Sequence, residues 1–146
     1  MANSRITFTL NEVVTALNSH ADAILRAGFD LTFSQFLFLL SLREGPKTLT
    51  EAANFQGVSV AAISKRIDWF EERGLVTSSV DPKRGRKDSL KLTVKGKNLI
   101  EKSSVALETK FRQIFKEIKA INLDQLNKDL NLINEHLIST PKESKK

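Results

Sequence analysis

A cationic turn is the part of this sequence best suited to binding a charged partner. Residues 81–88 read Asp-Pro-Lys-Arg-Gly-Arg-Lys-Asp. The longer segment 81–97 contains seven Lys or Arg against two Asp, a net charge of +5, while the whole chain carries +6. Spread over a surface, such an excess would favour solubility alone. Gathered in one segment, it predicts binding to a polyanion such as nucleic acid.

The cationic turn lies between two short runs of β-like composition, residues 75–80 and 89–93. Upstream of them, a helical pattern begins at Ser59 and stops at Gly74. This order predicts a helix followed by a hairpin with a positively charged tip, which is the layout of a winged helix-turn-helix. In that layout the helix enters the major groove of DNA, and the tip of the hairpin (the wing) enters the neighbouring minor groove.

The helix predicted after Ser59 has one apolar face and one face of small or polar side chains. The apolar face consists of Val60, Ile63, Ile67 and Phe70, and the outer face consists of Ala61, Ala62, Ser64, Lys65 and Asp68. Small outward side chains let a helix sit deep in a major groove. Ser59 and Ser64 can then hydrogen-bond phosphates or base edges. Ala61 and Ala62 can touch thymine methyl groups, and Lys65 and Arg66 can reach the DNA backbone or guanine.

The arginines and the lysines of the wing are expected to contact different parts of the DNA. Arg84 and Arg86 have the length and charge to enter a narrow A·T-rich minor groove, which attracts guanidinium groups. Lys83, Lys87 and Lys91 suit phosphates better. The simpler interpretation of any charge run is a solvated surface. We prefer DNA binding for the wing, and solvated surface for Asp68, Glu71 and Glu72.

Composition predicts one ordinary globular domain in a cytoplasmic, nucleoid-associated protein. The chain has 146 residues, 40% of them hydrophobic and 27% charged, and its isoelectric point is about 9.7. No apolar run approaches the ~18 residues of a membrane span, and the first residues lack the pattern of a secretory signal. With no cysteine, the sequence offers no disulfide, no thiol nucleophile and no Cys-ligated zinc.

No group of residues predicts an enzyme, a cofactor or a metal site. The six glycines are accounted for by turns and helix ends, so none builds a phosphate-binding loop. His20 and His136 are the only histidines and lie near opposite ends of the chain. Two histidines without cysteine are a poor transition-metal site. Trp69 is expected to cover the edge of the core rather than to stack on a base.

Gly, Pro and helix-capping residues predict six helices and one hairpin. The predicted first residues are Thr9, Thr32, Thr50, Ser59, Thr93 and Asn122. Thr9-x-x-Glu12 and Thr32-x-x-Gln35 have the form of capping boxes, in which the side chains at both ends satisfy backbone N–H groups. The second helix is apolar nearly all round, which predicts burial, and Gly45-Pro46 is expected to end it. Thr48-Leu49 could form a short strand.

Four segments in register resemble the multiple-antibiotic-resistance regulator (MarR) family of winged-helix transcription factors. They are Glu72-Arg73-Gly74-Leu75-Val76, Asp81-Pro82, an Arg at the wing tip, and Leu92-Thr93-x-x-Gly96. The wing of the family usually reads Asp-Pro-x-Asp-Arg-Arg. Here Arg84 and Gly85 replace its second Asp and first Arg, and Arg86 matches its last Arg. The tip is therefore more cationic and less braced than is usual in the family.

The resemblance covers the whole chain and implies a mainly α fold with a small β-hairpin. It implies one domain, 1–146, with a winged helix-turn-helix DNA-binding region at 32–93, dimerisation helices at 9–28 and 94–140, and a disordered tail at 142–146. Members of the family pair through their terminal helices, so we expect a homodimer on a pseudo-palindromic double-stranded operator.

The resemblance also implies a transcriptional regulator, which we expect to be a repressor released by a small apolar or anionic effector. Family effectors bind between the dimerisation helices and the winged region. Phe29, Phe33 and Phe36 suggest an aromatic lining there, but the sequence names no polar anchor, so no effector residues are assigned. The alternative is a winged-helix module that docks another protein and binds no DNA, although such modules seldom keep a basic wing.

Overall fold

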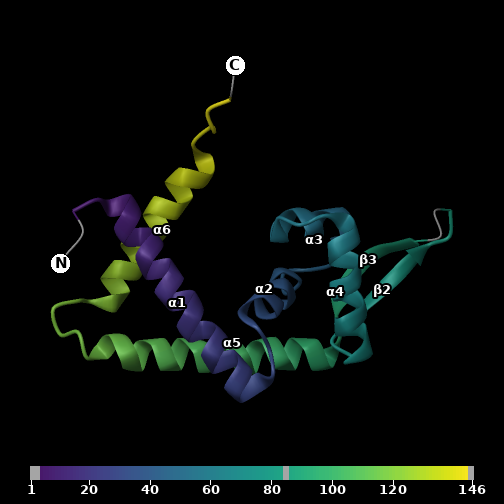
Figure 1. Ribbon diagram of the computed structural model, residues 1–146, viewed down its shortest axis with the longest axis horizontal. Coiled ribbons are helices and arrows are strands. Elements are labelled where there is room, and N and C mark those ends of the chain that lie inside the picture. Colours follow the sequence, from purple (N-terminus) through teal and green to yellow (C-terminus); the bar gives the residue numbers. More distant parts are fainter. Residues whose placement is uncertain (1–3, 84–85, 145–146) are drawn as a thin grey trace. The chain divides into compact units, whose positions relative to one another are not determined.

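The computed structural model describes residues 4–83 and 86–144 as six helices and three short strands. The helices are α1 (Ile6–Phe29), α2 (Phe33–Ser41), α3 (Leu49–Gln56), α4 (Val60–Glu72), α5 (Val94–Lys116) and α6 (Leu123–Ser139). The strands are β1 (Lys47–Thr48), β2 (Val76–Asp81) and β3 (Arg86–Leu92). This order confirms the predicted mainly helical fold with a small hairpin, and Figure 1 follows it along the chain.

Helix caps account for most of the boundaries. The predicted capping box of α2 is present, because the Thr32 hydroxyl accepts from Gln35 N and the Gln35 side chain accepts from Thr32 N. Ser59, Thr93 and Asn122 cap α4, α5 and α6 as predicted. Each cap satisfies a backbone donor that has no partner inside its helix.

Three predicted boundaries are wrong. The first helix begins at Ile6 rather than at Thr9, whose hydroxyl donates to the carbonyl of Arg5 one turn earlier. The third helix is capped by Thr48 rather than Thr50, because Thr48 and Glu51 complete a capping box. The second helix ends at Ser41, before Gly45-Pro46.

The chain separates into two compact units, residues 1–107 and 108–146. In the first unit, the three strands form an antiparallel sheet in the order β1-β3-β2, with a bulge at Ser79/Val80. Its core is apolar and includes Phe38 and Phe70, whose rings stack with centroids 4.6 Å apart. Other buried members are Leu25, Leu39, Ile63, Ile67, Leu90 and Ile100. The predicted burial of α2 is confirmed by Phe36, Phe38 and Leu39.

The second unit contains the last turns of α5 and all of α6. Phe111 and Phe115 stack at 5.9 Å on α5 and line a groove of about 170 Å³ together with Leu123, Leu126 and Leu130. Arg112 bridges to Asp124 at 3.5 Å. Along α6 no residue is buried, and apolar side chains such as Leu137 and Ile138 are 67% and 77% exposed.

Candidate nucleic-acid interface

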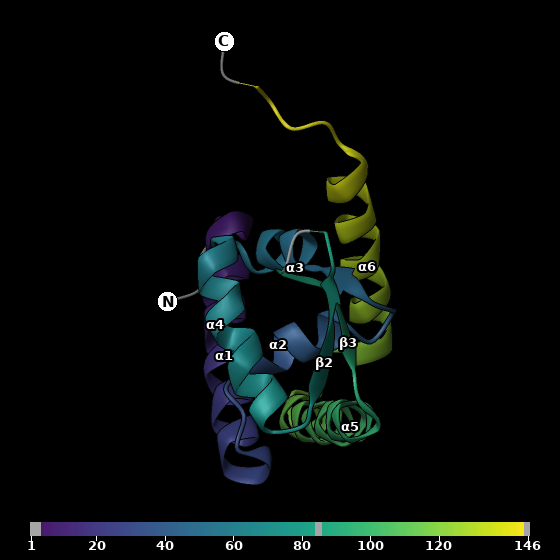
Figure 2. The same ribbon diagram turned by 90° about the vertical axis from the view of Figure 1, so that its right-hand side faces the viewer.

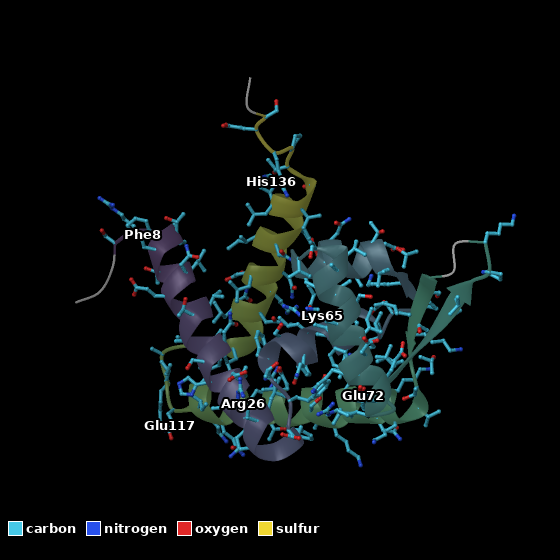
Figure 3. All side chains as sticks on the ribbon, turned by 45° about the vertical axis from the view of Figure 1, so that its right-hand side comes forward. Phe8, Arg26, Lys65, Glu72, Glu117 and His136 are labelled. Carbon is cyan, nitrogen blue, oxygen red and sulfur yellow. The ribbon has the colours of Figure 1, made fainter. Side chains whose placement is uncertain are left out.

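The N-terminal half of α4 presents short side chains to solvent. Ser59 caps the helix by accepting from Ala62 N at 3.1 Å. Ala61 is exposed, while Ala62 and Ser64 are half-buried. One turn further on, Lys65 is exposed on the same helix, where Figure 3 labels it. These short side chains let the N-terminal half of α4 approach the floor of a DNA groove closely, and Lys65 places a positive charge one turn further along the helix.

The inner face of α4 is formed by Ile63, Ile67 and Phe70, all buried as predicted. Val60 was expected to join them but is 40% exposed. Val60 is the first residue of the helix, directly after the cap at Ser59. Val60 is therefore part of the exposed tip of α4.

Arg66 is held differently from its neighbour Lys65. Its side chain is half-buried, and its guanidinium donates to the Oε1 atom of Gln56 at the end of α3. Gln56 in turn donates through Nε2 to the carbonyl of Ser34 on α2, at 3.0 Å. Two consecutive hydrogen bonds, which start from the Arg66 side chain, thus link α4, α3 and α2.

The β2–β3 hairpin lies beside α4. In Figure 1 the strands β2 and β3 extend outward beyond α2, α3 and α4, and in Figure 2 the hairpin and α4 stand side by side. Lys83 is exposed in the turn. Arg84 lies outside the described residues. The backbones of Arg86 and Lys87 belong to β3, opposite Asp81 and Val80, and their side chains are outside the description.

Glu71 connects α4 to the hairpin, which the sequence did not reveal. Its Oε1 atom accepts from the Ser78 hydroxyl at 2.6 Å, so the half-buried Glu71 is not the plain solvated residue we expected. Seven positions separate the two residues, across the left-handed turn at Gly74. The turn at Gly74 brings β2 back beside α4, so no local sequence pattern predicts this hydrogen bond.

The C-terminal end of α4 is fastened to the start of α5. The Thr93 hydroxyl donates to the carbonyl of Gly74 at 2.6 Å, and Lys95 Nζ donates to the carbonyl of Arg73 at 2.9 Å. Gly96 packs so tightly that an added Cβ would lie 2.2 Å from the carbonyl oxygen of Leu75. The Thr93-x-x-Gly96 motif is thus a structural joint at the base of the wing.

The half-buried Trp69 meets the buried Phe70 edge-to-face at 5.1 Å, in agreement with its predicted place at the edge of the core. The Arg73 guanidinium lies over its ring at 3.6 Å. Arg73 also donates to the Trp69 carbonyl. Arg73 and Phe70 therefore both contact the indole.

A family model matches part of the chain. The model for the MarR family matches residues 29–87, which run from the end of α1 through the hairpin to Lys87 in β3. Among curated proteins, none matches the sequence at a significant level.

Solved structures share the fold over nearly the whole chain. Wild-type MarR from E. coli is 20% identical with a TM-score of 0.74, and the alignment covers 93% of this chain and 99% of that one. The transcriptional repressor CouR bound to a 23-mer DNA duplex is 24% identical with a TM-score of 0.72, covering 93% of each chain. CouR from Rhodococcus jostii RHA1 bound to p-coumaroyl-CoA is 19% identical with a TM-score of 0.75, covering 96% of each.

The chain therefore has the winged helix-turn-helix fold of these solved structures. Residues 29–87, which contain the helix-turn-helix and most of the wing, are similar to the MarR family. Within the described residues, no single helix is both long and apolar enough to cross a membrane.

Proposed function

We propose that this chain is a homodimeric repressor that binds a pseudo-palindromic double-stranded operator. The observation that carries the proposal is the pairing of α4 with a cationic hairpin in one fastened unit. The Glu71–Ser78 hydrogen bond and the joint at Gly74 hold the two elements together. A helix for the major groove and a wing for the minor groove then act on the same DNA face.

In this proposal the tip of α4 reads the major groove. Ser59, Ala61, Ala62 and Ser64 lie closest to the bases, because their short side chains permit a close approach. Lys65 reaches a phosphate or guanine from the exposed face behind them. Arg66 makes a smaller direct contribution than Lys65, since its guanidinium already donates to Gln56.

The wing supplies most of the charge in this proposal. Lys83, Arg84, Arg86 and Lys87 stand within five consecutive positions. Arg84 and Arg86 enter the minor groove, and the two lysines contact phosphates. Neutralising phosphates releases condensed counterions, so affinity falls steeply as salt is added.

Exposed apolar side chains support a homodimer. The first half of α1 exposes Ile6, Phe8, Val13 and Val14, and α6 exposes an apolar stripe along its length. Water-exposed apolar area on this scale marks a protein interface. A second copy of the chain, pairing through its terminal helices, covers these faces and sets two α4 helices about 34–36 Å apart, one turn of B-DNA.

Regulation by a small molecule is the last part of the proposal. One neighbour by fold is a repressor bound to DNA, and another structure carrying the name CouR holds p-coumaroyl-CoA. We place this chain in the same mode of action, a cytoplasmic repressor that an organic anion releases from its operator.

Selection from a random pool of duplexes tests the proposal. The protein should enrich inverted repeats whose half-sites are centred about 10 base pairs apart. A Lys65→Ala variant should enrich the same repeats more weakly. Recovery of single half-sites would contradict the dimer, and recovery of no sequence at all would contradict operator recognition and favour a protein-docking module.

A further inference from the structure

Val60 is an exposed apolar residue at the tip of α4. It is 40% exposed, whereas Ile63, Ile67 and Phe70 on the same helix are at most 1% exposed. It follows the cap residue Ser59 directly and is the first residue of the helix. Single exposed apolar side chains are common on protein surfaces, so exposure alone gives Val60 no role. Three further features of the tip do.

The first feature is that the tip of α4 carries no charge. Residues 57–62 read Gly-Val-Ser-Val-Ala-Ala, and the first cation after them is Lys65. Within this segment Ser59, Val60 and Ala61 are exposed. Their methyl and hydroxyl groups attract no phosphate by charge, so they select a base edge by shape and apolar contact. The methyl group that base edges present in the major groove is the 5-methyl of thymine.

The second feature is that the first turn of α4 fixes Val60 before DNA binds. The Ser59 hydroxyl accepts from Ala62 N at 3.1 Å, and the Ser59 carbonyl accepts from Ile63 N at 3.0 Å. These hydrogen bonds close the first helical turn around Val60. Valine is itself stiff, because its branched side chain strongly prefers one rotamer in a helix. Little conformational freedom is therefore lost when the valine methyl groups meet a base.

The third feature is the side of α4 on which Val60 lies. Glu71 stands 11 positions after Val60. This spacing is about three helical turns, so the two side chains leave α4 on nearly the same side. Glu71 accepts from the Ser78 hydroxyl of β2 at 2.6 Å, and Figure 2 shows the hairpin beside α4. Val60 is therefore on the side of α4 that faces the hairpin, whereas Ala61 and Lys65 lie further round the helix.

We propose that Val60 is a specificity-determining residue, which reads one thymine in each half-site of the operator through the 5-methyl group. The inference rests on the proposed function and adds a base-reading residue to it. Because Val60 is on the hairpin side of α4, this thymine stands at the edge of the half-site nearer the minor groove that the wing enters. Any other base at this position leaves the valine methyl groups without an apolar partner in the groove.

Replacing thymine by uracil tests the proposal, because uracil keeps the hydrogen-bonding groups of thymine and lacks only the methyl. The duplex is the inverted repeat recovered from the random pool, with thymines replaced symmetrically in both half-sites, one position at a time. At one position on the wing side, uracil should weaken binding by the wild type about fourfold for each half-site, the factor for burial of one methyl-sized group. Fluorescence anisotropy of the labelled duplexes measures the affinities. Unchanged affinity at every position overturns the proposal.

Variants of Val60 identify the side chain that reads the methyl group. Val60→Ala should bind the thymine duplex more weakly than the wild type does, and its preference for thymine over uracil should fall below about twofold, since the coupled partner is missing. Val60→Thr keeps the branched shape but replaces one methyl by a hydroxyl, so it should lose part of the preference. Val94→Ala is the matched control, because Val94 is also the first residue of a helix and is 76% exposed. It should keep the full preference.

The outcomes separate a failure of this inference from a failure of the proposed function. If the wild type binds no duplex, operator recognition fails and the thymine contact fails with it. If the wild type binds with a steep salt dependence but ignores the methyl group, the proposed function stands and the role of Val60 is wrong. If Val60→Ala keeps the full preference for thymine, another side chain reads the methyl group. Thermal unfolding identifies a variant that fails to fold, and Val60→Thr then decides in place of Val60→Ala.

Discussion

Two adjacent cations of α4 serve different purposes at the scale of single residues. Lys65 is exposed and forms no described ion pair, whereas Arg66 is half-buried and bound to Gln56. The sequence predicted both as DNA contacts, because neighbouring positions on a helix differ by about 100° and Arg66 lay near the boundary of the buried face. Gln56 and Ser34 lie 10 and 22 positions from their partners, so no local pattern could predict the chain they form.

Lys65→Ala should weaken binding to the operator by about 1–2 kcal/mol and lower the salt slope by about one unit, because one phosphate contact is lost. Fluorescence anisotropy of a labelled duplex over a range of salt concentrations measures both quantities. Lys102→Ala is the matched control on α5 and should leave the slope unchanged. An unaltered slope for Lys65→Ala would contradict its assignment as a phosphate contact.

Asp22 makes the junction of α1 and α2 sensitive to acid. The Phe33 N–H and the Arg26 guanidinium hold the pKa of its carboxyl below the usual 3.8. A lowered pKa in the folded state stabilises the fold above the usual value, and this stabilisation is lost as the pH falls through the folded-state value.

Asp22→Asn should therefore lower the free energy of unfolding at neutral pH, and the difference from the wild type should shrink as the pH falls below 3.8 through the lowered pKa of Asp22. Urea unfolding at several pH values measures this difference. Glu44→Gln, an exposed change in the loop after α2, is the control. A difference that stays constant down to the most acid pH would show that Asp22 acts through packing rather than charge.

At the scale of elements, the sequence predicted the order of helices and strands correctly, and most of the caps. The prediction of caps failed at Thr9, and it failed at Thr50, because Thr48 caps α3 instead. Thr9-x-x-Glu12 and Thr48-x-x-Glu51 have the same form, yet only Thr48 caps a helix, while the Thr9 hydroxyl bonds back to Arg5 within one. A hydroxyl can satisfy either role. The apolar residues Ile6 and Phe8 extend α1 beyond the apparent cap, and no rule of spacing anticipates that.

Gly96→Ala should be strongly destabilising, because its Cβ would lie 2.2 Å from the Leu75 carbonyl oxygen. We expect a loss of about 1–3 kcal/mol and weaker DNA binding, since the joint between α4 and α5 must shift. Gly28→Ala is the matched control within α1, where an added Cβ meets nothing within 4 Å. That change should be neutral or stabilising by up to about 1 kcal/mol. Thermal unfolding of both variants measures the contrast, and similar effects at the two glycines would refute the joint.

The Ser78–Glu71 hydrogen bond should matter more for DNA binding than for stability. Ser78→Ala removes one hydrogen bond and should cost about 0.5–1.5 kcal/mol of unfolding free energy. If this bond also orients the wing against α4, the affinity for the operator should fall as well. Ser79→Ala, on the exposed neighbouring position, serves as the control. Unchanged DNA affinity in Ser78→Ala would assign the bond a purely structural role.

At the scale of the whole molecule, the proposed binding to a pseudo-palindromic operator requires a second copy of the chain. The stripe of Leu126, Leu130, Ile133 and Leu137 on α6 has no buried member. Its helical spacing was visible in the sequence. The sequence could not predict how much of this apolar stripe α5 covers, because that depends on the turn at residues 117–122.

Leu130→Glu with Leu137→Glu should convert the dimer into monomers, since two charges cannot be buried in an apolar interface without partners. Sedimentation measurements on the double variant and on the wild type give the masses directly. Asn131→Glu, on the other side of α6, should leave the dimer intact. A wild type that sediments as a monomer at every concentration would remove the basis for a pseudo-palindromic operator.

The central claim is that the wing and α4 bind one duplex together, and a salt titration of operator binding tests it most directly. The logarithm of the association constant should fall linearly with the logarithm of salt concentration, at about 0.9 per phosphate neutralised. Replacing both Arg84 and Arg86 by Ala should reduce that slope and weaken binding by about 1–3 kcal/mol per arginine. A slope near zero, or an identical slope and affinity in the double variant, would contradict the account.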